Sequence, residues 1–515
     1  MSADPHGDSD IADLAKGGRT NFFGFLLRLA ARVPFLFIAG RLYGPDALGR
    51  FALAILVVEF AAQLATFGLK RGLAQQLSKD ERPHVHICWD ALFIAGIASA
   101  VGATILAAVP ALMFPNSNIN GLEQLLPLTI FAIAWSDVSL AALAYRHDVA
   151  ATVRARAIIE PWTISIAAGT LYFYSRRDGL ILAYALSMIA ALTASLIPFF
   201  RAYGWPRGWR PQGMELFRLA RRNMPLAAAD AIEWGTRNVD RFILGLFFSP
   251  AVVGIYWVAQ QIVTLPQKLK TSFDPILGPV ITQNLEAGNK AAVAAQVRQV
   301  GFWIMAAQAG IALALAIPGE AVMGLAGRDF VRGTGVLAFL LAAEVIAAMA
   351  VVSEAALVYV ARHRNLMISF ATIALQIALS FALIFALDTI QPEVPLQQDR
   401  FAAAGPAVAL PLALGFASVM KARLLSRLLG APVSAWRWAL VWASAVAAVV
   451  GFVAIQVPEW LELTVGLPCI LLSYGLVIWY KGFTHEDRVL FRLKDAKATL
   501  PPPKGAPSGG DAVSR

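Results

Sequence analysis

The sequence predicts an all-α polytopic membrane protein with about fourteen transmembrane helices. Hydrophobic residues make up 58% of its 515 positions and charged residues only 15%, whereas a soluble domain is about 45–50% apolar and about 25% charged. The mean hydropathy is +0.63. Because one span uses about 20 apolar residues, the composition suffices for about fourteen spans. It excludes a soluble enzyme, a disordered protein and a secreted disulfide scaffold.

Apolar runs separated by polar breaks locate the individual spans. They lie at 21–43, 47–67, 88–114, 122–145, 156–174, 179–200, 225–248, 250–272, 297–318, 334–360, 366–388, 401–420, 436–457 and 460–480. The first run is too long for the apolar core of a signal peptide, so we expect a retained first helix. The segment after Tyr480 is polar and ends in Pro, Gly and Ser, which predicts disorder.

The distribution of Lys and Arg predicts the orientation, because these residues concentrate in cytoplasmic loops. If the N-terminus is cytoplasmic, seven of the 43 fall in outer loops: Arg41, Arg50, Arg176, Arg177, Arg328, Arg332 and Arg400. Four more lie within spans and the remaining 32 on the inner side. An even number of spans returns the C-terminus to the cytoplasm. The net charge of +10 therefore indicates topology, and no nucleic-acid partner is expected.

The most basic inner loop divides the chain into two related halves. We expect a cytoplasmic N-terminal segment (1–20), an N-lobe of six helices (21–200), this loop (201–224), a C-lobe of six helices (225–420), two further helices (436–480) and a cytoplasmic tail (481–515). A shift of 205 residues aligns Gly40 with Gly245, Pro45 with Pro250 and Gly49 with Gly254. Because six spans separate the copies, the repeat is parallel, about an axis along the membrane normal.

Charged residues within the spans are the candidate functional residues, since each costs about 2.5–3.5 kcal/mol at the bilayer centre and usually faces a cavity or a partner. The first span carries Arg28 and Arg32, and the seventh carries Glu233, Arg237, Asp240 and Arg241 on one stripe. Further acids within spans are Glu59, Asp90, Asp137, Glu160, Glu344 and Glu354. Two structural alternatives stay open. Glu233 and Arg237 have the spacing of an ion pair, and Arg28 can extend toward the interface.

Arg32 has neither alternative, because no acid lies one turn away in its helix and it lies too deep to reach the interface. We expect it to line a polar cavity between the halves, opposite the repeat-related Arg237. Guanidinium groups stay charged when desolvated and bind phosphate oxygens in a bidentate way. Such a cavity would bind an anionic diphosphate headgroup and repel a cationic drug.

Other sites are weakly indicated. His84, His86 and Cys88 have a spacing that could bind a metal, but an interfacial cluster is the expected alternative, and no metal site is predicted. Cys88 and Cys469 form no disulfide framework. There is no G-x-x-x-x-G-K-[ST] nucleotide motif, and Gly68–Gly72 is expected to be a basic turn. The outer loops near 319–333 and 389–400 are too short for a catalytic domain, so no catalytic residue is expected.

Two stretches carry a resemblance to a known family. Asn238–Gly245 (NVDRFILG) followed by Val253–Ala259 (VGIYWVA), and Arg41–Phe51 (RLYGPDALGRF) with Phe67-Gly68-Leu69, are similar to the span signatures of bacterial polysaccharide flippases. These are the Wzx-like members of the multidrug/oligosaccharidyl-lipid/polysaccharide (MOP) exporter superfamily. The resemblance covers most of the chain.

The resemblance implies a V-shaped pair of lobes and alternating access, with an undecaprenyl-diphosphate-linked oligosaccharide flipped across the bacterial inner membrane. It implies a cavity lined by the helices that carry Arg28, Arg32, Arg237 and Arg241, and coupling to Na⁺ or H⁺ without a bound cofactor. Glu233, Asp240, Glu344 and Glu354 are candidates for ion coupling or structural pairing. The implied partners are the lipid-linked glycan, membrane lipids, and polysaccharide polymerase or chain-length machinery. The alternatives are a peptidoglycan lipid-precursor flippase and a multidrug/cation antiporter, although the latter would need an acidic cavity.

Overall fold

The computed structural model describes residues 33–79, 82–115, 122–271, 281, 284–285, 288–389 and 395–483. This part of the chain is helical throughout and contains no strand. The N-lobe helices are η1 (Ala39–Tyr43), α2 (Gly44–Ala65), α3 (Leu69–Lys79), α4 (His84–Ala108), η2 (Pro110–Leu112), η3 (Glu123–Leu128), α5 (Thr129–Tyr145), α6 (Val149–Thr152), η4 (Val153–Ile159), α7 (Glu160–Leu171) and α8 (Gly179–Tyr203).

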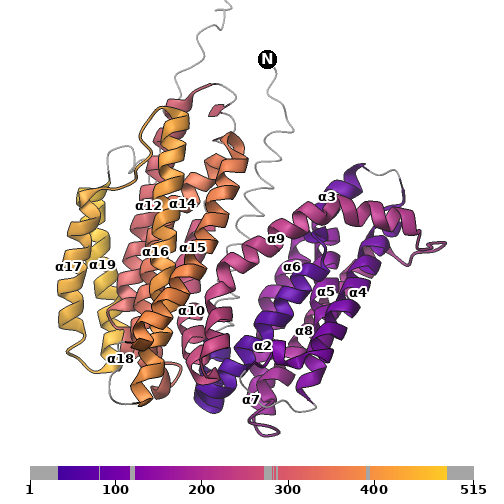
Figure 1. Ribbon diagram of the computed structural model, residues 1–515, viewed down its shortest axis with the longest axis horizontal. Helices are drawn as coiled ribbons and strands as arrows, with labels where there is room; N and C mark the ends of the chain where they lie inside the picture. The colour runs from indigo at the N-terminus through magenta and orange to yellow at the C-terminus, as the bar shows by residue number, and fades with distance from the viewer. Residues whose placement is uncertain are drawn as a thin grey trace, which may run out of the picture.

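The C-lobe begins with a helix of 35 residues, α9 (Gly213–Phe247). It continues with α10 (Pro250–Thr271), α12 (Lys290–Ala316), α13 (Gly319–Gly324), η5 (Arg328–Gly333), α14 (Thr334–Val360), α15 (Arg362–Thr389) and α16 (Pro395–Leu429). A last group consists of α17 (Trp438–Ala454), α18 (Glu459–Leu461), η6 (Glu462–Gly466), α19 (Leu467–Val477) and η7 (Ile478–Gly482). Figure 1 shows α17 and α19 as a pair on the outer side of the C-lobe, where both pack against α12.

Each predicted apolar run coincides with helix in the part of the chain that the structure describes. Within that part, nine helices are long and apolar enough to span a membrane by length and composition. The segment α9 does not qualify, because its charged residues lower its hydropathy. The run at 436–457 forms the shorter helix α17. The polytopic all-α fold class is therefore confirmed.

Two segments differ from the sequence prediction. The basic turn predicted at Gly68–Gly72 is wrong beyond Gly68, because the helix α3 begins at Leu69. This helix buries Leu69, Leu73 and Leu77, four residues apart, against the N-lobe. Most of the loop predicted at 201–224 is also helical, because α8 continues to Tyr203 and α9 begins at Gly213. In both segments an amphipathic stretch too short or too polar to span a membrane gains its stability from packing on the N-lobe.

Figure 1 shows two lobes that meet at one end and diverge toward the other. They meet where α2 packs along α10, and α9 runs between them, in contact with α2, α3 and α4 on one side and α10, α15 and α16 on the other. One apolar core runs from the N-lobe through this junction into α10 and α14. A second core joins α12, α14 and α16 to α17 and α19.

The repeat predicted from the sequence appears as a reciprocal contact. A Cβ added to Gly49 would overlap the carbonyl oxygen of Pro250, and a Cβ added to Gly254 would overlap that of Pro45. The two aligned Pro-x-x-x-Gly stretches thus face each other across the lobe junction. Such mutual contact is expected where two repeat-related segments lie beside the axis that relates the lobes.

Candidate functional site

The predicted arginines of the first span lie outside the described residues, so the predicted pairing of Arg32 with Arg237 and the position of Arg28 stay predictions. Glu233 lies on α9, but the structure does not describe its side chain. The other candidates can be placed. Arg237 is exposed on the surface of α9, whereas Asp240 is buried and Arg241 is partly buried.

Asp240 is held by donors from two helices. Tyr256 on α10 donates its hydroxyl to Oδ2 over 2.5 Å, and Gln260, one turn further along α10, donates Nε2 to the same oxygen over 2.8 Å. The backbone N–H of Arg241 donates to Oδ1 over 2.9 Å. These three donors satisfy a carboxylate that is only 1% exposed, and they anchor the C-terminal half of α9 to α10.

Arg241 is only partly engaged by its surroundings. Its guanidinium donates to the Oδ1 of Asn238, one turn earlier. The side-chain amide of Asn238 donates in turn to the carbonyl of Trp234 over 2.8 Å. The Nε of Arg241 is buried and has no hydrogen-bond acceptor among the described residues. A buried donor without an acceptor is costly, so this N–H can donate to an oxygen of a ligand or of water.

Glu59 is a candidate site residue to which the sequence prediction assigned no role. It lies exposed in the middle of α2, accepts a hydrogen bond of 3.4 Å from the Tyr184 hydroxyl, and lies within electrostatic range of Arg241. One residue further, the Phe60 ring stacks on Trp234 of α9 at 4.8 Å between centroids. The sequence feature that marks Glu59 as a candidate is an acidic residue within an apolar run. Its position opposite α9 could come only from the tertiary structure.

Aromatic rings close the junction of the lobes beside these charges. The Phe51 ring of α2 contacts Trp257 of α10 edge-on at 6.1 Å and Tyr184 of α8 at 6.0 Å. Phe35 contacts both Phe51 and Trp257, at 5.8 and 6.4 Å. The charged side chains of α9 therefore lie next to an apolar, tightly packed seam between the two halves.

The two remaining acidic candidates lie on α14 and have protein partners. Glu344 is buried and accepts a hydrogen bond of 2.8 Å from the Gln267 amide. Glu354 forms an ion pair with the buried Lys421 of α16, with 2.9 Å between Nζ and Oε2. Lys421 also donates to the Ser369 hydroxyl over 3.1 Å. The contacts of Glu354 are those of a structural pair that joins α14, α15 and α16.

A second charged group lies inside the N-lobe. Arg156 forms ion pairs with Asp137 and, over 2.7 Å, with Glu160. Lys70 approaches Asp137 at 3.2 Å from the start of α3. Two basic and two acidic side chains balance one another here, so the group joins α3, α5, η4 and α7 without an excess charge for a ligand.

The weakly indicated metal site does not form. Among the described residues no group of three or more His, Cys, Asp or Glu side chains could hold a metal ion. The His84 ring packs edge-on against Tyr145 at 5.6 Å, and His86 Nε2 lies 3.2 Å from the carbonyl oxygen of Arg207. Cys88 is buried. These contacts place the three side chains in the packing of the α4 N-terminus.

Comparisons with known proteins agree with this fold. The chain is similar over 91% of its length to a structure of the lipid II flippase MurJ in an inward closed conformation, with a TM-score of 0.64, 12% identity and 99% of that chain covered. It is similar over 78% of its length to an inward-facing multidrug resistance MATE family transporter of the MOP superfamily, with a TM-score of 0.59, 13% identity and 95% of that chain covered. At these identities the likeness shows the fold. No curated protein matches the sequence.

The family assignment rests on the sequence itself. Residues 38–319, more than half of the chain, match the model of a family described as polysaccharide biosynthesis protein. The matched segment includes α2, α9 and α10, and so both copies of the Pro-x-x-x-Gly stretch and the charged part of α9. The chain therefore belongs to this polysaccharide biosynthesis protein family, as its resemblance to the Wzx-like flippases predicted.

Proposed function

We propose that this protein flips an undecaprenyl-diphosphate-linked oligosaccharide across the bacterial inner membrane, for the synthesis of a cell-surface polysaccharide. The observation that carries the proposal is the pair of arginines, Arg237 and Arg241, on α9 between the lobes. Arg237 is exposed there, and the adjacent Arg241 has a buried Nε without an acceptor among the described residues. Guanidinium groups match the oxygens of a diphosphate. The family description supports a glycan as the rest of the substrate.

Glu59 gives this site a counter-charge in the absence of substrate. Its carboxylate lies within electrostatic range of Arg241, so an arriving diphosphate competes with it for the guanidinium. In the proposed cycle the substrate displaces this interaction and α2 and α9 rearrange relative to each other. The substrate would then contact Arg241 in one conformation and not in the other. Such a difference in contacts is what allows a substrate to shift the population between two conformations.

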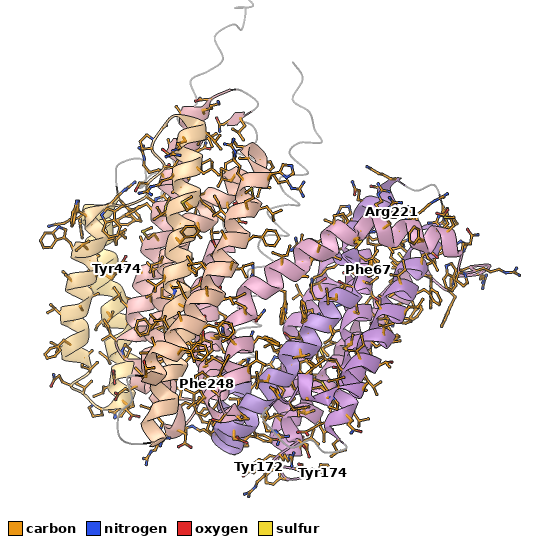
Figure 2. The ribbon with its side chains drawn as sticks, viewed as in Figure 1. Phe67, Tyr172, Tyr174, Arg221, Phe248 and Tyr474 are labelled. Carbon is orange, nitrogen blue, oxygen red and sulfur yellow. The ribbon has the colours of Figure 1, made fainter. Side chains whose placement is uncertain are left out.

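We propose that the diverging end of the lobes faces the cytoplasm, with both termini on that side. Figure 2 shows Arg221 and Phe67 at the diverging end and Tyr172 and Tyr174 at the opposite end. The arginine-rich loop and the start of α9 lie at the diverging end, where the positive-inside rule expects the cytoplasm. The substrate would then enter from the inner leaflet.

Coupling to a Na⁺ or H⁺ gradient is part of the proposal. Among the acidic candidates, Asp240 is the one described as buried directly beside Arg241. Binding or release of a cation at the Asp240 carboxylate would alter its hydrogen bonds with Tyr256 and Gln260. It would thereby change how α9 is attached to α10. Glu354 has the contacts of a structural residue because Lys421 neutralises it.

The test is a flipping assay in liposomes with a fluorescent undecaprenyl-diphosphate oligosaccharide. We expect the wild type to move this lipid and the Arg237→Ala, Arg241→Ala double variant to move it at least about a hundredfold more slowly, equivalent to about 2.7 kcal/mol. The matched control is Arg328→Ala, Arg332→Ala, which removes two exposed arginines from η5. Equal rates for the two double variants would disprove the proposed site.

The peptidoglycan lipid precursor is the alternative substrate, supported by the similarity in fold to a lipid II flippase. Both lipids carry a diphosphate, so the arginines do not distinguish them. Competition between the two lipids in the same assay decides between them. Preferential transport of the peptidoglycan precursor would make it the substrate in place of the lipid-linked oligosaccharide. The proposed arginine site would be unaffected.

A further inference from the structure

The loop after α8 and the first turns of α9 expose an unusual mixture of side chains. We propose that residues 204–224 form a docking surface for the anionic phospholipid headgroups of the membrane, independent of the site between the lobes. The apolar members are 62–71% exposed: Trp205, Met214, Phe217 and Met224. Three of them recur on α9 at positions 214, 217 and 224, so they share one helix face.

Arginines accompany these apolar side chains on the same segment. Those that are exposed are Arg207, Arg210, Arg218, Arg221 and Arg222. Glu215 is the only acid of the segment, and it pairs with Arg218 at 2.7 Å. The surface is therefore strongly cationic. Apolar side chains interleaved with arginines on one helix face are typical of a segment that lies in a bilayer interface and attracts anionic lipids.

The opposite face of the segment is fixed on the N-lobe, so the exposed face is a defined surface. Leu219 and Asn223 are buried, and the Asn223 side chain occupies the space that a Cβ on Gly72 would need. Trp209 donates Nε1 to Asp90 over 2.9 Å. Arg222 donates to the Gln76 side chain over 2.9 Å. These bonds hold the loop and the first turns of α9 against α3 and α4.

The position of the surface favours phospholipid over the other anionic occupant, the transported lipid. Figure 1 shows the start of α9 and its preceding loop at the outer edge of the N-lobe, away from the junction of α2 and α10. A headgroup bound there is on the perimeter that bulk lipids surround. Charge complementarity selects anionic headgroups, and the exposed Met, Phe and Trp side chains select a partner with acyl chains.

Titration of phosphatidylglycerol into the detergent-solubilised protein tests the arginines, with bound lipid counted by native mass spectrometry. The variant is R207Q/R210Q/R221Q and the matched control is R176Q/R328Q/R332Q, which removes three exposed arginines elsewhere. We expect phosphatidylglycerol to bind the variant about a hundredfold more weakly than the wild type and the control, since each of the three interfacial arginines contributes about fivefold. Equal binding by both variants, or equal binding of phosphatidylcholine and phosphatidylglycerol by the wild type, would overturn the proposal.

A fluorescence measurement tests the apolar part and does not depend on the stability of the arginine variant. Met214→Cys is made in a Cys469→Ser background, labelled with bimane and placed in nanodiscs that contain phosphatidylglycerol. We expect brominated phospholipid to quench the label more strongly than iodide in the aqueous phase. A label quenched only by iodide would place this face in water. Weaker binding of undecaprenyl diphosphate by R207Q/R210Q/R221Q than by R176Q/R328Q/R332Q would identify the surface as a substrate site and reject the phospholipid proposal.

Discussion

Gly49 of α2 and Gly254 of α10 face each other with no room for a side chain. A Cβ on Gly49 would lie 2.8 Å from the backbone nitrogen of Gly254, and a Cβ on Gly254 would lie 2.9 Å from that of Gly49. Small residues let helix backbones approach closely in membranes. Here they hold together the end at which the two lobes meet.

Gly49→Ala should therefore open this junction. Alanine normally stabilises a helix by about 1 kcal/mol relative to glycine. Any loss of stability or transport in this variant must therefore come from the overlap of the new Cβ with Pro250. We expect transport at least about tenfold slower, equivalent to about 1.4 kcal/mol, and longer distances between spin labels at Asp46→Cys and Ala251→Cys in a Cys469→Ser background. Gly475→Ala, at a glycine with open space around it, is the control, and equal behaviour of the two variants would contradict the prediction.

Substitution of the arginines tests the cationic mechanism in cells. Arg32→Ala and Arg237→Ala should each abolish surface glycan while the protein stays in the membrane, because each removes a guanidinium expected to bind the diphosphate. Lysine at either position should restore export only in part, since an ammonium group does not reproduce the bidentate fork. Surface glycan is measured by gel staining and protein by membrane immunoblot. Normal export by the double alanine variant would reject the mechanism.

The Tyr256 hydroxyl should contribute measurably to stability through its 2.5 Å hydrogen bond to Asp240. Loss of a bond to a charged group costs about 1.5–3 kcal/mol, so Tyr256→Phe should lower the free energy of unfolding in detergent by about this amount. Tyr474→Phe is the matched control, because the Tyr474 hydroxyl is buried without a partner among the described residues and its removal should be nearly neutral. Figure 2 labels Tyr474, on α19. A loss of stability as large in the control would contradict the assignment.

Glu354 and Lys421 should behave as a structural pair. Glu354→Gln leaves the Lys421 ammonium, which is 5% exposed, without its carboxylate. It should therefore destabilise the protein by more than Lys421→Met, which leaves a carboxylate that is 44% exposed. The double variant Glu354→Gln, Lys421→Met should recover stability and keep transport. Thermal unfolding and the liposome assay provide the measurements, and a double variant that is stable but inactive would indicate that Glu354 takes part in coupling.

The spans could be read from the sequence because each is a continuous apolar run, and a run of that length forms a helix in lipid whatever its neighbours are. The helix α3 was not predicted because only four of its eleven residues are buried, and only Leu69, Leu73 and Leu77 among them are large and apolar. Its helix depends on the N-lobe surface beneath it. The start of α9 at Gly213 was not predicted for the same reason. Its first turns form an amphipathic helix, and their exposed arginines make the sequence look like a polar loop.

The sequence by itself determined the all-α membrane fold, the paired Pro-x-x-x-Gly stretches and the charges within α9, because hydropathy and local spacing depend only on neighbours along the chain. Tertiary structure alone decided which of these charges are satisfied. Asp240 finds its donors 16 and 20 residues away on α10, and Glu354 finds Lys421 at a separation of 67 residues. Whether two side chains form an ion pair or a hydrogen bond depends on their distance in space. Folding sets that distance, whereas the spacing of residues along one helix does not.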